Sequence, residues 1–258
     1  MSILRINLNA DVGESFGAWQ MGNDGALLRL IGSASIACGF HAGDPLVMRR
    51  TLRAALAAGV SVGAHPSFPD LQGFGRRPMQ IPPAELEAML IYQIAALAGL
   101  AQAEGGRLTH VKPHGALNNM ACEDVGLANT VVAAIRSYDP ALILLAPVMS
   151  QLLLAGETAG LRVVGEVFAD RTYTETGSLT PRRQPGSILH SAGECVRHVL
   201  HMVEKGGVVS SGGRVIPTNF HSICVHGDSP ATVAAATAIG EALLAAGCRL
   251  VSLPEVVA

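Results

Sequence analysis

Residues 7–14 read NLNADVGE, a strand-like alternating run that ends in two acids, Asp11 and Glu14. Five more apolar runs end in polar clusters, four of them with histidine: ACGFHAGDP (37–45), VGAHPSFPD (62–70), HVKPHGALNN (110–119), CVHGDSP (224–230) and, without histidine, VVGEVFADR (163–171). Helix-like stretches separate these runs. A strand, a polar cluster and a helix, repeated along a chain, is how a (β/α) barrel gathers a site at one mouth. The sequence therefore predicts an enzyme whose site lies at that mouth.

The expected strands are rich in valine, isoleucine and leucine at consecutive positions, which is typical of parallel strands buried on both faces. We expect them at residues 3–9, 33–38, 60–64, 108–112, 142–146, 162–168 and 221–226, with a short extra run at 249–253. If this sheet closes, its first and seventh strands become neighbours. Asp11, His41, His65 and His226 would then come from adjacent strand ends.

The helix signals fall between the strands. Asp44 and Pro45 can start a helix over 44–58 that Gly59 ends. The remaining helices are expected after Ile81-Pro82-Pro83 up to Gly105-Gly106 and at 123–137, 148–159, 191–205 and 229–247. Two excursions, 66–81 and 169–190, are predicted to form walls or a lid of the site, and 206–220 is predicted to be a β-hairpin.

Composition bounds the class of protein. The chain has 258 residues, of which 49% are hydrophobic, and this favours one barrel domain over residues 1–258. A net charge of −2 without a basic block argues against nucleic-acid binding. The apolar stretch 141–156 is interrupted, and no signal-peptide pattern opens the chain, so we expect no membrane span. Five cysteines, an odd number, favour reduced thiols and a cytoplasmic location, with Cys38 and Cys224 as core residues.

The segments NLNADVGESFG, ACGFHAGDP, GAHPSFPDLQGFGRR, VKPHGALNN, EVFADRTY and SICVHGD occur in this order between Asn7 and Pro254. This series resembles the LamB/YcsF family. Two positions depart from the family pattern, which has tyrosine where this chain has Asn118 and commonly aspartate where it has His221.

The resemblance implies an α/β fold, an irregular, TIM-like, seven-stranded (β/α) barrel related to glycoside hydrolase and deacetylase barrels. It also implies the activity of the A subunit of a 5-oxoprolinase, a hydrolase acting on a cyclic amide. That activity opens 5-oxoproline to L-glutamate with ATP as co-substrate and with partner subunits B and C.

Opening a lactam needs a base for water, cations or N–H groups for developing negative charge, and an anchor for the substrate carboxylate. The predicted catalytic residues are Asp11, Glu14, His41, His65, Lys112, His114, Glu166 and Asp170. Lys112 and His114 are two residues apart and so can point to one side of an extended strand. The alternatives are a capping role for Asp11, structural roles for the histidines and a solvent-directed Lys112. His110, His190, His198 and His201 are interpreted as core, packing or surface residues.

A second group is predicted to bind substrate or phosphate: Asn9, Asp44, Arg76, Arg171, His226 and Asp228. In HAGDP and HGDSP, a histidine leads through glycine into a helix start, where free N–H groups favour an anion. The alternative is that Asp44 and Asp228 only cap their helices.

Cofactor signals leave several readings open. No Walker-type or dinucleotide-binding glycine motif is present, so ATP would bind through another arrangement or through the partner subunits. Asp11 with two histidines would suit a divalent metal, although no H-x-x-x-H pair or C-x-x-C occurs. The alternatives to the lactam reaction are a metal-dependent carbohydrate deacetylase and a non-catalytic subunit that binds the substrate.

Overall fold

The computed structural model describes residues 3–227 and 229–258. Strands alternate with helices along most of the chain. The strands are β1 (Arg5–Val12), β2 (Ser33–Ala37), β3 (Ser61–His65), β4 (Leu108–Val111), β5 (Ile143–Pro147), β6 (Arg162–Phe168), β7 (Gly207–Val209), β8 (Val215–Pro217), β9 (Ser222–Cys224) and β10 (Arg249–Leu250). The helices are α1 (Asp24–Leu27), α2 (Pro45–Ala57), α3 (Pro83–Ala103), α4 (Gly115–Glu123), α5 (Val125–Tyr138), α6 (Gln151–Thr158), α7 (Ala192–Lys205), α8 (Pro230–Ala245) and α9 (Leu253–Val256).

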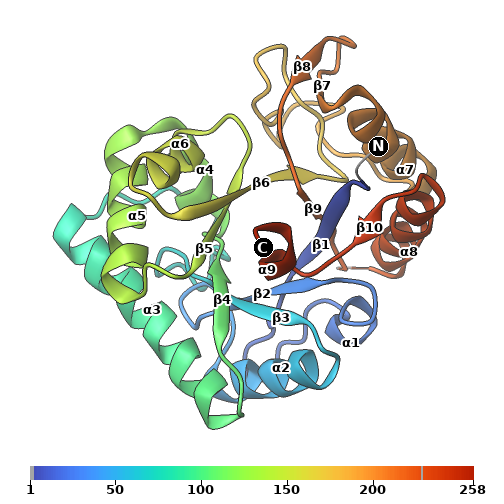
Figure 1. Ribbon diagram of the computed structural model, residues 1–258. Helices are drawn as coiled ribbons and strands as arrows, with labels where there is room; N and C mark the ends of the chain where they lie inside the picture. The colour runs from blue at the N-terminus through green and yellow to red at the C-terminus, as the bar shows by residue number, and fades with distance from the viewer. Residues whose placement is uncertain (1–2, 228) are drawn as a thin grey trace.

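Seven parallel strands close into a barrel in the order β1-β2-β3-β4-β5-β6-β9, and β9 pairs back onto β1. This confirms the expected TIM-like α/β barrel and the pairing of its first and seventh strands. β10 adds a short parallel pairing at the start of β1. Figure 1 looks along the barrel, with helices around the ring of strands. The carboxyl ends of all seven strands therefore meet at one mouth.

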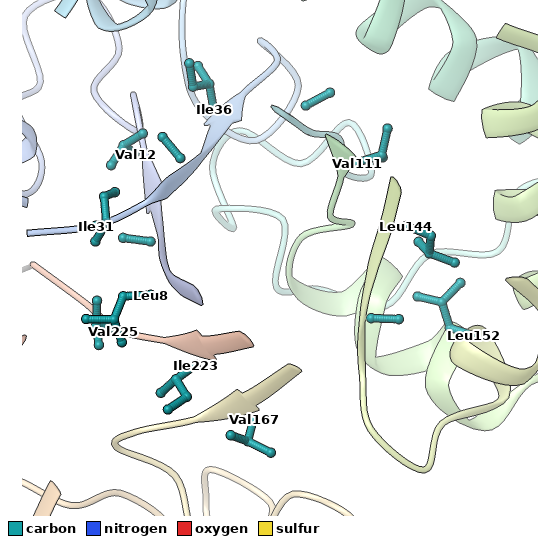
Figure 2. Close-up of a cluster of buried hydrophobic side chains, with 14 of the residues drawn as sticks. Leu8, Val12, Ile31, Ile36, Val111, Leu144, Leu152, Val167, Ile223 and Val225 are labelled. Atoms are coloured by element: carbon teal, nitrogen blue, oxygen red, sulfur yellow. The ribbon is translucent and has the colours of Figure 1, made fainter. Parts of the chain in front are cut away.

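The barrel strands are buried on both faces, as expected, but the two faces differ in polarity. Outward-facing residues such as Leu8, Val111 and Ile223 pack into the layer between strands and helices (Figure 2). On the inner face, the Lys112 Nζ atom contacts Asn9 Oδ1 at 3.1 Å, although β1 and β4 are not neighbours. The contact crosses the interior, so much of the inside is polar. Side-chain hydrogen bonds link polar groups there, as between Asn7 and both Ser33 and Ser222.

The C-terminal residues close the amino ends of the strands. In Figure 1, α9 lies in the middle of the ring. Leu253 is fully buried and packs with Ile143, Leu145 and Val164, and its N–H donates to Ser33 Oγ over 2.9 Å. The predicted strand 249–253 is thus β10 followed by the start of α9. The capping box of Ser252 and Glu255 fixes that helix start. Apolar side chains thus fill the amino end of the barrel, and the polar mouth lies at the carboxyl ends of the strands.

We expect Leu253→Ala to lower the free energy of unfolding by about 2–5 kcal/mol, because it empties a closed apolar space in the barrel. Urea unfolding of the full chain measures this change. Leu244→Ala, at a residue 56% exposed on α8, is the matched control. Equal unfolding midpoints for the two variants would show that α9 does not plug the barrel.

By length and composition one described helix, α3, could cross a membrane, with a mean hydropathy of 1.4. Its position explains its composition. It connects β3 to β4, and Leu86, Leu90, Ile94 and Leu97 form a fully buried stripe along it. An apolar helix in this place serves as a crossover helix of a barrel.

The remaining predictions about elements are largely confirmed. Residues 207–217 form the antiparallel pair β7–β8, and the excursions 66–81 and 169–190 contain no helix or strand. Three helices were missed: α1, α4 and α9. α4 follows β4 after three residues, within the segment interpreted as a polar strand end, and α1 has only four residues.

Candidate functional site

Lys112 lies at the centre of a buried polar cluster at the carboxyl end of β4. Its Nζ atom is 3.0 Å from Asp11 Oδ1, 2.9 Å from Glu166 Oε1 and 3.1 Å from Asn9 Oδ1. An ammonium group has three donors, and three oxygens surround it here. Burial alone would lower the pKa of Lys112, but the charges around it, Asp11 first, outweigh burial and raise that pKa well above its usual value. Lys112 is therefore protonated and carries a positive charge inside the barrel.

The two acids beside Lys112 differ. Burial would raise the pKa of Asp11, but the nearby His65 and Lys112 hold it well below its usual value. For Glu166, burial is the dominant cause, and its pKa is raised despite Lys112. Asp11 has a side chain 16% exposed, whereas that of Glu166 is fully buried. Asp11 is thus the ionised acid that meets solvent, and Glu166 is the inner partner that fixes the lysine.

Three histidines pack together next to Asp11. His65 Nε2 is 3.3 Å from Asp11 Oδ2 and 2.9 Å from His114 Nδ1. The ring of His41 stacks on that of His114 with 3.9 Å between centroids. Glu14 Oε1 lies 3.6 Å from His41 Nε2 and 3.7 Å from His114 Nδ1. Burial lowers the pKa of His41 and of His114 well below the usual value, so these two rings are neutral at physiological pH.

The excursion 66–81 forms one wall of this cluster, as predicted. Asp70 accepts N–H groups of Gly73 and Arg77 and pairs with the Arg77 guanidinium, which fixes the turn. Gly75 has φ +63°, and a Cβ atom there would lie 2.9 Å from His41 Cβ. A glycine is required at this position.

Asp170 and His226 form a separate pair at the mouth. Asp170 Oδ2 is 2.9 Å from His226 Nδ1, and both side chains are partly exposed. Burial would lower the pKa of His226, but Asp170 above all, with Cys224, raises it well above its usual value. Asp170 itself has a lowered pKa, because His226 outweighs the effect of burial. The pair is ionised at neutral pH.

This pair should make stability depend on pH. A histidine whose pKa is higher in the folded than in the unfolded chain stabilises the fold. The stabilisation is fully present at pH values below the pKa in the unfolded chain, about 6.5, and is lost as the pH rises through the pKa in the folded chain. The stability of the chain relative to His226→Gln should therefore be largest near pH 6 and shrink toward pH 9. Urea unfolding across this range measures it. In an Asp170→Asn background the trend should disappear, and a constant difference in the unchanged background would refute the assignment.

Several predicted residues lie elsewhere or have structural partners. Asp44 accepts N–H groups of Leu46, Val47 and Gly17, which favours the capping alternative over a phosphate seat. Arg171 donates to the carbonyl oxygens of Ser187 and Thr180, so it ties the 169–190 excursion together rather than facing a ligand.

The remaining residues named from the sequence are Arg76, Asp228, His221 and Asn118. Arg76 lies over the ring of Phe74 at 5.0 Å, beside the histidines. Asp228 lies outside the described residues. His221 is exposed along an outer groove with Val148 and Met149, away from the cluster, and Asn118 is buried on α4.

One site residue was interpreted only as core. Cys224 is buried, as expected, but its Sγ atom lies 3.3 Å from Lys112 Nζ. Burial raises the pKa of this thiol. Its spacing from His226 could have revealed this position. Cys224 precedes His226 by two residues on an extended segment, so both side chains can point to the same side.

A closed parallel barrel with acids, a lysine and histidines gathered at one mouth defines the class of TIM-like α/β barrels with a polar site at the strand ends. A model of the LamB/YcsF family matches residues 6–258. The chain belongs to the LamB/YcsF family.

Individual relatives agree with this assignment. A protein of Azoarcus sp. (strain BH72), named as the A subunit of a 5-oxoprolinase, is 62% identical over 253 residues, covering 98% of this chain and 99% of its own. The crystal structure of the lactam utilization protein from Thermus thermophilus superposes with a TM-score of 0.92 at 42% identity, over 97% of this chain and 100% of that one.

A more distant structure shares the fold alone. The catalytic domain of a peptidoglycan N-acetylglucosamine deacetylase from Eubacterium rectale is 14% identical, with a TM-score of 0.50 over 96% of this chain and 87% of that one. The expected relation to deacetylase barrels is therefore confirmed for the architecture.

Proposed function

We propose that this chain is the A subunit of an ATP-dependent 5-oxoprolinase, which opens 5-oxo-L-proline to L-glutamate together with subunits B and C. The observation that carries the proposal is the Lys112 ammonium held between Asp11 and Glu166 beside neutral histidines. The name of the 62% identical relative supports the choice of substrate.

The reaction can be written with the groups at the mouth. The lactam oxygen attacks the γ-phosphorus of ATP, and ADP leaves. Water that loses a proton to Asp11 adds to the activated ring carbon. The C–N bond then breaks, the ring nitrogen takes a proton, and a second water converts the acyl phosphate to glutamate and phosphate.

Each group has a role suited to its environment. Asp11 is ionised, partly exposed and oriented by two neighbours, which are the properties of a general base. Lys112 carries a fixed charge that can stabilise negative charge on the lactam or phosphoryl oxygens. His226 is a charged acid at the mouth that can supply the proton for the leaving nitrogen. Glu166 and Asn9 position Lys112.

In this proposal, part of the ATP-binding site is formed by the partner subunits and not by this chain. The sequence has no phosphate-binding glycine loop, and Asp44 occupies the N–H groups that begin α2. Arg76, beside the histidines, is the candidate of this chain for contact with a phosphate. Subunits B and C would supply the remaining contacts to the nucleotide.

Reconstitution tests the proposal. The full chain is combined with subunits B and C, 5-oxoproline and ATP, and glutamate and ADP are measured. Glutamate should form only when all three subunits and ATP are present. Equal glutamate release without this chain would refute the proposal, and so would acetate release from N-acetylated amino sugars by this chain alone with no release of glutamate by the full mixture.

A further inference from the structure

Two ring nitrogens of the histidine cluster, one of His65 and one of His114, lie at hydrogen-bond distance from each other. His65 Nδ1 is 2.6 Å from the carbonyl oxygen of Lys112, and His114 Nε2 is 2.9 Å from that of Phe74. A carbonyl oxygen only accepts, so in neutral rings the protons lie on those two nitrogens. The remaining nitrogens, His65 Nε2 and His114 Nδ1, are 2.9 Å apart and both carry lone pairs. This arrangement requires a cation, either a shared proton or a metal ion.

His41 distinguishes these two cations. It is fully buried, and neither of its ring nitrogens has a hydrogen-bond partner in the part of the chain that the structure describes. A proton shared by His65 and His114 would leave both His41 nitrogens unsatisfied. An ion bound also by His41 Nε2 and Glu14 Oε1, which lie 3.6 Å apart, would use one of them.

The distances suit a first-row transition metal. Zinc binds histidine nitrogen and carboxylate oxygen at about 2.0–2.2 Å, so tetrahedral ligand atoms lie about 3.3–3.5 Å apart. The separations here are 2.9, 3.6 and 3.7 Å, and the four ligand atoms lie within 4.8 Å of one another. Three nitrogen ligands favour a zinc-like ion over magnesium or calcium, which prefer oxygen.

Carbonyl groups also orient two of the ligands. Lys112 O and Phe74 O each accept from the outer nitrogen of one histidine, which is the usual support of a metal-binding imidazole. Because Gly75 has no Cβ, its backbone can pack against both His41 and His114. The Glu14 side chain is 14% exposed, so an ion can enter the cluster from solvent on the side of Glu14.

A second group of ligand-type side chains, Asp11, Cys224 and His226, is less suited to a cation. The Lys112 ammonium lies 3.0 Å from Asp11 Oδ1 and 3.3 Å from Cys224 Sγ and would repel a metal there. His226 is already paired with Asp170.

We propose that Glu14, His41, His65 and His114 bind one divalent transition-metal ion of the zinc type. Such an ion, when bound, polarises a carbonyl or phosphoryl oxygen and lowers the pKa of water. This metal site goes beyond the proposed lactam reaction, which was written without a metal ion. Metal binding can be measured without turnover, so the two proposals can be tested separately.

The test uses the full chain, stripped with a chelator and dialysed against Zn²⁺ or Co²⁺. We expect one equivalent of metal per chain by elemental analysis, a rise in melting temperature on adding the metal, and the visible absorption of Co²⁺ with nitrogen ligands. His41→Gln and His114→Gln each remove a proposed ligand and should weaken binding by more than the roughly tenfold that the loss of an outer-shell partner costs. Glu14→Gln, at the partly exposed ligand, should weaken binding while leaving the circular dichroism unchanged. His201→Gln, on the exposed face of α7, is the matched control.

Two outcomes would overturn the proposal. One is a chain that retains no metal above the level of a protein-free control. The other is metal binding that survives in His41→Gln and Glu14→Gln but is lost in His226→Gln, which would assign the ion to the second group.

Discussion

Asp11→Asn should lower the rate of glutamate formation by the three-subunit complex about 10²–10⁴-fold, the usual contribution of a general base. Asparagine keeps the shape of the side chain but cannot take a proton from water. It also removes a negative charge that lies 3.0 Å from Lys112 Nζ and 3.3 Å from His65 Nε2. The measurement is steady-state glutamate release at saturating ATP.

Asp139→Asn is the matched control for the loss of one carboxylate. Asp139 accepts the N–H of Ala141 at the turn after α5, a role that asparagine can also fill. If folded Asp11→Asn turned over as fast as this control, Asp11 could not be the base.

Lys112→Met should have the largest effect on stability, because it leaves Asp11 and Glu166 without their shared cation. Removing one partner of a buried ion pair costs about 3–5 kcal/mol. The variant should therefore unfold at a much lower urea concentration and form no glutamate. Lys205→Met, whose lysine pairs with the exposed Glu204, should change stability by at most about 1 kcal/mol.

A double variant separates the loss of charge balance from the loss of packing. In Lys112→Met/Glu166→Gln the buried carboxylate is neutralised, so part of the lost stability should return. Equal midpoints for Lys112→Met and Lys205→Met would show that the cluster does not hold the barrel together.

Short-range patterns in the sequence were enough to predict the barrel. Each expected strand overlaps an observed one, because parallel strands are apolar runs bounded by helix caps and glycines. The pairing of β1 with β9 was predicted on the condition that the sheet closes, and the sheet does close. α4 was missed because Gly115, with φ +58°, turns the chain into a helix directly after the polar residues of β4.

The polar interior was hidden for a different reason. On β1 the alternation of Asn7, Asn9 and Asp11 was visible, but on β5 the inner residues Ile143 and Leu145 are apolar like the outer ones. A periodicity of two could not show which face looks inward. Only the contacts between β1, β4 and β6 show that.

The site was predictable where a residue sits at a strand end and not where its partner is distant in the chain. Asp11, His65 and Lys112 meet as the strand order predicted. The partners of Asp44 and Arg171 are backbone groups of Gly17, Thr180 and Ser187. Contacts of this kind leave no pattern in the sequence, so the structural role of Arg171 could not be recognised. Asp44 differs, because its capping of α2 through Leu46 and Val47 is local and was one of the two interpretations left open.

The most direct test of the central claim is a crystal structure of the complex of this chain with subunits B and C, bound to 5-oxoproline and a non-hydrolysable ATP analogue. We expect the lactam at the carboxyl ends of β1, β3 and β4, with its ring carbonyl facing Lys112 and its reacting carbon facing Asp11. A lactam bound elsewhere, for example in the outer groove beside Met149 and His221, would contradict the account.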